Sequence, residues 1–163
     1  MTNLFLFFPD GSIGAMCLNG PGVLHDSTMA IFGEVYDRCK HFYTRFDVRG
    51  VVDSAFTTKN ADYFIKSAQT PPENGDAEEM LIFQEATSVR QMSEWGMRAF
   101  QGSWPRLKDR MLYEERGERS IILQVIARLH NLRANLVGIN QIRSIFMPHL
   151  DMPIDRFMSF YDA

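Results

Sequence analysis

Apolar residues of this chain form short runs near the N-terminus and helical patterns further on. The run NLFLFF (3–8), the turn PDGS (9–12) and the run IGAMCL (13–18) predict two strands joined as a hairpin. Two further short strands are predicted at 51–53 and 63–66, because both segments are brief and rich in β-branched or aromatic residues.

Three later segments carry apolar residues at helical spacing, and we expect helices at about 27–45, about 79–101 and 120–137. Asp26 precedes the first as an expected N-cap, and Gly138 fits the position after the last. Strands come first and helices dominate later. This order predicts an α/β or α+β fold with a small sheet.

The chain has 163 residues, which fits one domain with a sizeable core. It is 45% apolar and 23% charged, as expected for a folded domain, and its net charge is −3 with a pI of about 5.8. It therefore lacks the global basic character of many nucleic-acid binders. Only residues 84–143 have a basic surplus, with 10 Lys and Arg against 6 Asp and Glu, so only a local patch could face phosphate.

The two cysteines, Cys17 and Cys39, suit neither a disulfide framework nor a CxxC metal site. We interpret them as free, partly buried thiols of a reducing compartment. The first twelve residues have no basic region and no cleavage site, so we expect no signal peptide. No stretch reaches the roughly 18 apolar residues of a membrane span.

Asp53 ends the short apolar run at 50–52, which is an unusual place for an acid. An Asp at this position most often caps the next turn, but it could also hold a metal ion. The same two interpretations, a structural role or metal binding, apply to His25 and Asp26. In the structural interpretation Asp26 is an N-cap and His25 is a hydrogen-bonding loop residue.

Arg90, Glu94 and Arg98 follow one another at intervals of four, so they share one face of the expected helix. The simplest interpretation is a surface salt-bridge ladder. Arg106 and Lys108 follow in a basic cluster that could touch phosphates, although a solvated face is the commoner role of such a run. The P-loop, GxGxxG, GxSxG and HExxH motifs do not occur in the chain.

Five segments in series carry a family resemblance: NLFLFFPDGSI, PGVLHDS, VVDSAF, YFIKS and SVRQMSEWGMRAFQGSWPRL. In this order, from about residue 3 to about 150, they resemble the C-terminal two-thirds of the endonuclease domain of Harbinger-type DDE transposases. The resemblance implies an RNase H-like α/β fold, a small mixed sheet flanked by helices, over residues 1–150. Residues 151–163 would form a C-terminal tail.

The resemblance also implies a metal-dependent reaction on DNA in the nucleus. In this family three carboxylates hold two divalent ions, Mg²⁺ or Mn²⁺, that activate the nucleophile for phosphodiester cleavage and strand transfer. Asp53 matches the second Asp and Glu94 the Glu. Asp26 matches a site-adjacent HDS motif and could be a further ligand. Arg90, Arg98, Arg106 and Lys108 would contact DNA.

One departure from the family pattern is important. The family's first Asp lies on a strand upstream of a hairpin like 3–18, and this chain begins at that hairpin. The resemblance therefore implies a truncated domain with its first strand missing, impaired catalysis, and open sheet edges that a partner protein or a second copy could cover. The alternative function is a catalytically inert, domesticated module that binds DNA or protein.

Overall fold

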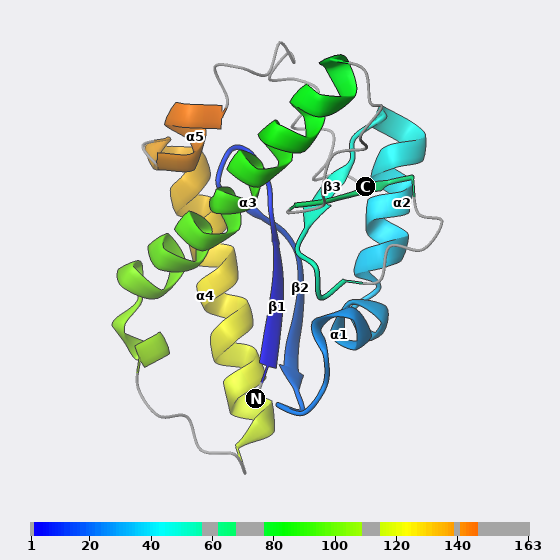
Figure 1. The fold of residues 1–163 in the computed structure, drawn as a ribbon. Coiled ribbons are helices and arrows are strands. Elements are labelled where there is room, and N and C mark those ends of the chain that lie inside the picture. Colours follow the sequence, from blue (N-terminus) through cyan, green and yellow to red (C-terminus); the bar gives the residue numbers. More distant parts are fainter. Residues whose placement is uncertain (1, 57–61, 68–76, 109–114, 139–140, 147–163) are drawn as a thin grey trace.

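The structure is a computed structural model of the whole chain. It describes residues 2–56, 62–67, 77–108, 115–138 and 141–146. The fold is mixed α/β, as predicted, and Figure 1 shows its elements in three layers. Strands lie in the middle, α1 and α2 cover one side, and α3 and α4 cover the other. The expected tail at 151–163 lies outside the described residues.

The predicted hairpin is confirmed. Strand β1 (Thr2–Phe7) pairs antiparallel with β2 (Ile13–Gly20). The turn between them is held by Asp10, whose carboxylate accepts hydrogen bonds from the backbone N–H and the hydroxyl of Ser12 at 2.8 and 2.6 Å. Gly11 in this turn has φ 85°, a conformation that a residue without a Cβ adopts at little cost.

The other two strands are also present, but they do not join the hairpin. Strand β3 (Gly50–Val52) pairs in parallel with β4 (Phe64–Lys66). Within the described residues the strands thus form two separate two-stranded sheets, where one small mixed sheet was expected. In both pairs, each strand has one edge to which no other described strand is paired.

The prediction of one helix at 27–45 is wrong. The structure has two helices, α1 (Asp26–Phe32) and α2 (Val35–Phe46). The chain breaks between them because Glu34 takes a left-handed conformation with φ 54°. The predicted N-cap is also misplaced. His25 occupies the cap position without a side-chain capping bond, and Asp26 is the first helical residue.

The two long helices are confirmed and extend beyond the predicted bounds. Helix α3 spans Ala77–Ser103 and α4 spans Arg116–Val137. Gly138 ends α4 as predicted, with φ 63° and its N–H donating to the carbonyl of Ala134. The short 3₁₀ helix η1 (Pro105–Lys108) and helix α5 (Gln141–Phe146) were not predicted. No helix in the described part of the chain is long and apolar enough to cross a membrane.

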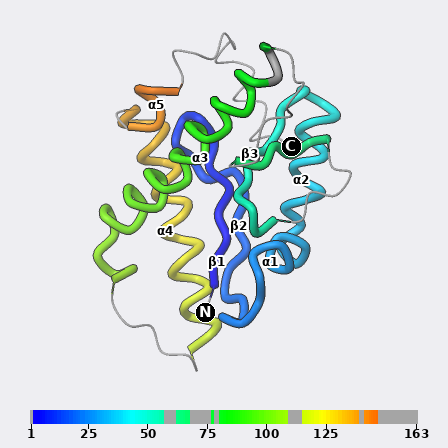
Figure 2. The backbone as a smooth tube through the Cα atoms, in the orientation of Figure 1, coloured from blue at the N-terminus to red at the C-terminus, as the bar shows by residue number. Residues whose placement is uncertain are grey.

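Strand β1 is apolar on both of its faces, and the two faces pack into different clusters. Phe5 and Phe7 pack with Phe100 of α3 and residues of α4. Leu4 and Leu6 pack on the other side against a cluster built by α1, α2 and β4. The smooth trace in Figure 2 follows this strand through the middle of the molecule, between the two helical layers. Strand β1 is therefore packed on both faces, although β2 is its single strand partner among the described residues.

Candidate functional site

Asp53 directly follows β3, at the strand end where its sequence position placed it. Its carboxylate accepts a hydrogen bond from the backbone N–H of Ala55 at 2.9 Å, and its carbonyl accepts one from the N–H of Phe56 at 3.4 Å. The side chain is partly buried. Asp53 therefore performs the turn-forming role considered from the sequence, with one carboxylate oxygen engaged in that turn.

Glu94 lies on the solvent side of α3. One of its carboxylate oxygens is 3.4 Å from a guanidinium nitrogen of Arg90, and the two side chains are 50% and 45% exposed. Met92 and Gly96, two positions away on either side, are buried, and a Cβ on Gly96 would approach the Phe7 ring to 2.6 Å. Residues two apart lie on nearly opposite sides of a helix, so Glu94 occupies the face opposite to the one that packs on β1.

The third acidic candidate, Asp26, is partly exposed at the start of α1. Among the described residues no group of three or more His, Cys, Asp or Glu side chains is arranged to hold a metal ion. Within the described residues, Asp26, Asp53 and Glu94 therefore do not make up a three-carboxylate metal site.

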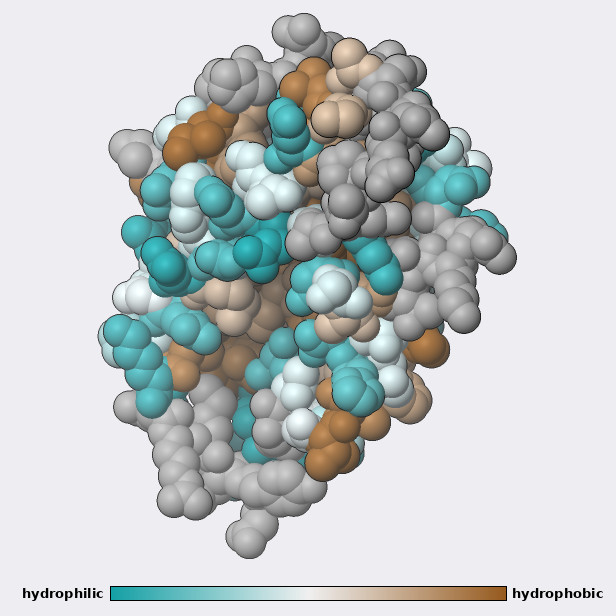
Figure 3. Space-filling view, viewed as in Figure 1, coloured by the Kyte–Doolittle hydropathy of each residue, from teal (hydrophilic) through white to brown (hydrophobic). Residues whose placement is uncertain are grey.

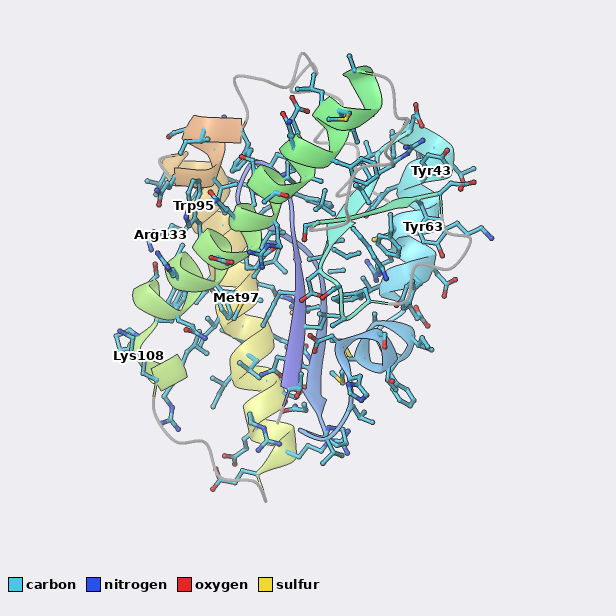
Figure 4. The ribbon with its side chains drawn as sticks, viewed as in Figure 1. Tyr43, Tyr63, Trp95, Met97, Lys108 and Arg133 are labelled. Carbon is cyan, nitrogen blue, oxygen red and sulfur yellow. The ribbon has the colours of Figure 1, made fainter. Side chains whose placement is uncertain are left out.

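The basic candidates are accessible. Arg90 and Arg98 lie exposed on α3, and Arg106 and Lys108 lie exposed on η1. Figure 4 shows Lys108 on the same side of the molecule as Arg133 of α4, whose guanidinium donates a hydrogen bond to the Ser103 hydroxyl at the end of α3. The C-terminal half of α3 and the elements that follow it thus present several cations to solvent.

Two of the three aromatic residues of α3, Trp95 and Phe100, lie close to neighbouring elements. Phe100 is 2% exposed and its ring is 5.1 Å from that of Phe5, so it is a core residue. Trp95 is partly buried against Phe146 of α5, with ring centroids 5.9 Å apart. Both rings therefore contribute to packing, which agrees with their helical spacing in the sequence.

A depression of about 350 Å³ lies between the β3–β4 pair and the first half of α3, and no sequence pattern predicted it. The depression is lined by three charged residues, Asp47, Arg49 and Glu85, and by five apolar residues, Val51, Ile65, Ile82, Ala86 and Val89. Neither Asp53 nor Glu94 is among these lining residues. No motif or spacing connects these positions along the chain. They meet only because α3 crosses over the two strands.

Two buried titratable groups lie away from all of these candidates. Burial raises the pKa of the Cys39 thiol on α2 to about 12, so it is protonated at neutral pH. Burial lowers the pKa of His130 on α4, chiefly by desolvating the charged ring, and its Nε2 lies 3.1 Å from the carbonyl oxygen of Gly11. The ring nitrogen Nδ1 has no hydrogen-bond partner within the described structure.

The comparison with protein families identifies the chain. A family model described as DDE superfamily endonuclease matches residues 1–131, which is most of the sequence. The chain belongs to this family. Neither the curated proteins nor the solved structures contain a match. DDE endonucleases generally use divalent metal ions and act on DNA, so the family agrees with the chemistry that the sequence resemblance implied.

Proposed function

We propose that this chain is a Harbinger-type, transposase-derived DDE endonuclease domain that has DNA as its partner and little or no catalytic activity by itself. The family match over residues 1–131 supports the reaction class. The observation that supports the impairment is the engagement of the two candidate acids with other groups of the chain, Asp53 with the N–H of Ala55 and Glu94 with the guanidinium of Arg90. In this proposal Asp53 and Glu94 are the retained acidic positions, Asp26 is a site-adjacent acid, and the metal is Mg²⁺ or Mn²⁺.

The physical basis of the impairment is the dependence of two-metal catalysis on its full ligand set. The two ions must stabilise the attacking and the leaving oxygen together, which requires carboxylates that fix both of them. Here one oxygen of Asp53 is engaged by Ala55, and Glu94 faces Arg90. Mg²⁺ keeps several of its waters and is commonly bound by one or two carboxylates together with substrate phosphates, so a carboxylate engaged elsewhere removes a large part of its protein ligand set.

A plasmid-nicking assay tests the proposed impairment. With Mg²⁺ or Mn²⁺, the chain is expected to nick supercoiled DNA no faster than its Asp53→Asn and Glu94→Gln variants. Metal-dependent nicking that both substitutions abolish would overturn the impairment and establish an active site at these acids. Nicking that survives both substitutions would reject the assignment of these two residues.

Mn²⁺ titration tests the metal position without requiring turnover. Paramagnetic Mn²⁺ broadens NMR signals of nearby nuclei, so amide signals around Asp53 and around Glu94 are expected to broaden together at low metal concentration. Asp53→Asn should weaken the broadening at both places. Broadening confined to one of them, or centred on Asp47 and Glu85 in the α3 depression, would show that the two proposed acids do not share an ion.

A second function, a catalytically inert DNA-binding module, is favoured by the exposure of Arg90, Arg98, Arg106 and Lys108. Binding through phosphate contacts weakens steeply as salt rises. Neutralising all four with Gln should weaken low-salt binding of duplex DNA and flatten its salt dependence, whereas Asp53→Asn should leave binding intact. Arg45→Gln with Lys40→Gln on α2 is a control elsewhere on the surface. Equal loss in test and control variants would indicate non-specific attraction.

A further inference from the structure

Helix α4 carries apolar side chains on two opposite faces. One face packs on strand β2 of the hairpin, and its residues are buried (Arg119, Leu123, Ile126, Ala127, His130, Ala134). The other face carries a row of exposed aliphatic side chains, which we call the α4 stripe: Ile121, Val125, Leu129, Leu132 and Leu136. Their exposed fractions range from 40% at Leu129 to 77% at Leu136. With 3.6 residues per turn, the stripe lies half a turn away from the buried face.

The neighbouring helix of the same layer has an ordinary solvent face. The exposed residues of α3 between positions 84 and 98 are all polar or charged. Figure 3 shows mainly hydrophilic residues over this middle part of α3. Monomeric proteins rarely expose a contiguous apolar patch larger than a few hundred Å², and larger patches mark interaction surfaces. The α4 stripe therefore differs from the rest of its layer in the way that an interface differs from a free surface.

The spacing of the α4 stripe fits a paired helix. Its members follow one another at intervals of four, four, three and four residues. Val125, Leu129, Leu132 and Leu136 thus occupy the alternating apolar positions of a seven-residue repeat, which is the pattern of a helix packed along a second helix. Ile121 lies one turn before them on the same face.

The same spacing makes the stripe complementary to itself. When two copies of α4 lie antiparallel, Ile121 of one copy falls opposite Leu136 of the other. Val125 then falls opposite Leu132, and the two Leu129 side chains meet next to the axis. Each member of the stripe therefore faces another member, as a two-fold symmetric interface requires.

The size of the stripe is sufficient for a reversible dimer. Five half-exposed aliphatic side chains present roughly 400 Å² of apolar surface. Two such stripes, with the polar residues on their flanks, bury on the order of 1,000 Å² together, which is about the smallest area of a specific interface. The dimer is therefore expected to dissociate on dilution.

The charges beside the stripe favour the antiparallel direction. Arg128 and Arg133 are exposed on its two flanks. In a parallel pair, Arg128 of each copy would lie beside Arg133 of the other, which brings two pairs of like charges together. In the antiparallel pair a single contact of this kind remains, between the two Arg128 side chains near the axis.

We propose that two copies of this chain associate through their α4 stripes, antiparallel about a two-fold axis next to Leu129. The occupant of the exposed face of α4 is thus the same face of a second copy. The association leaves the buried face of α4 on the hairpin unchanged, and it does not depend on nuclease activity.

Sedimentation equilibrium of the intact chain over a range of concentrations tests the association. The parent chain should show a monomer–dimer equilibrium, and Leu132→Glu should raise its dissociation constant at least tenfold. Gln124→Glu adds the same charge at an exposed position of α4 outside the stripe and should change the constant less than twofold. A chain that is monomeric at every concentration, or equal effects of the two variants, would overturn the proposal.

Two further variants make this measurement specific. Arg128→Gln removes the like-charge contact near the axis and should lower the dissociation constant at low salt, whereas a higher constant would contradict the arrangement. Circular dichroism shows whether each variant is folded. Should Leu132→Glu fail to fold, Leu132→Ala removes most of the apolar side chain without adding a charge and should weaken the dimer in the same direction.

Cross-linking with a short bismaleimide tests the direction of the helices. In the antiparallel pair, equal positions at 121 are separated by about 22 Å along the axis. Ile121→Cys and Leu136→Cys should therefore not cross-link by themselves, whereas a mixture of the two variants should. The parent chain, which has Cys17 and Cys39, is the control for cross-links that do not involve α4. Cross-linking of Ile121→Cys to itself, or a dimer whose mixed variants do not cross-link, would overturn the proposed interface.

Discussion

The side-chain amide of Asn131 forms both backbone hydrogen bonds of Ile13. Ile13 donates its N–H to Oδ1 at 2.8 Å, and its carbonyl accepts from Nδ2 at 2.9 Å. The amide, carried on α4, thus acts toward the first residue of β2 as a neighbouring strand would. Ile13 is 6% exposed, so neither of its backbone groups would readily find water as a substitute.

Asn131→Leu should destabilise the chain substantially. The substitution keeps the size of the side chain but leaves the buried N–H and C=O of Ile13 without partners, which costs about 2 kcal/mol or more. Urea unfolding followed by circular dichroism measures the change. Asn135→Leu, one turn further along α4 and exposed, is the matched control and should stay within about 0.5 kcal/mol of the parent. Similar losses in both variants would show that the paired hydrogen bonds contribute little.

Gly96→Ala should also destabilise, because α3 approaches β1 at this glycine. The added methyl would lie 2.6 Å from a ring carbon of Phe7, and relieving such an overlap in a packed core costs about 1–3 kcal/mol. Gly102→Ala is the control on the same helix, since nothing lies within 4 Å of its added Cβ. Helix propensity predicts a neutral or stabilising effect there, up to about 1 kcal/mol. Thermal unfolding should therefore occur at a lower temperature in Gly96→Ala and at an unchanged or higher temperature in Gly102→Ala, and an equal decrease in both variants would contradict the close approach.

These two contacts show where sequence patterns stop being informative. Periodicity predicted α3, α4, the hairpin and both short strands, because each element has its own apolar spacing. The break after Phe32 was missed because Glu34 adopts a left-handed conformation that its residue type does not favour. The pairing of Asn131 with Ile13 spans 118 positions, and no local spacing encodes it.

The candidate site also has features that local sequence predicts and features that it does not. The strand-end position of Asp53 and the helical position of Glu94 could be predicted from local sequence, and the structure confirms both positions. Whether carboxylates from different elements converge depends on how α3 is rotated about its axis, and that rotation is set by Gly96 and Phe100 against β1. The acidic and basic lining of the α3 depression was missed for this reason.

Cys39 should resist alkylation in the folded chain. Its pKa is raised to about 12 by burial, so the reactive thiolate is scarce at pH 8, and the side chain is 3% exposed. Iodoacetamide at pH 8, followed by peptide mass spectrometry, should modify Cys39 only in denaturant. Cys17 is less buried, its pKa is raised by a smaller burial, and it should react faster in the native state. Equal native labelling of the two thiols would contradict the packing of α2.

His130 should make the stability of the chain depend on pH. Its native pKa lies below the ordinary value of 6.5 because of burial, with Arg133 acting in the same direction and the carbonyl of Gly11 and the charge of Asp10 acting against it. The unfolded state therefore binds the proton first. The contribution of His130 to stability is complete above about pH 6.5 and is lost as pH falls toward the lowered native pKa.

The measurement is the free energy of unfolding between pH 5 and pH 8 for the parent chain and for His130→Gln. The variant should show a smaller loss of stability between pH 6.5 and pH 5, although it is less stable than the parent at pH 8. His41→Gln, at an exposed position on α2, is a second histidine substitution for comparison. An unchanged slope in His130→Gln would assign the pH dependence to other groups.

The two apolar clusters on either side of β1 are completed at different times during synthesis. The cluster that receives Leu4 and Leu6 is built from residues no later than Phe64, whereas the one that receives Phe5 and Phe7 includes Phe100 and Ile126. During synthesis, the side of β1 that carries Leu4 and Leu6 can thus be buried first. The side that carries Phe5 and Phe7 can be buried fully only after about sixty more residues have been synthesised. During that interval Phe5 and Phe7 lack their packing partners on α3 and α4, and the synthesis of α4 completes this cluster.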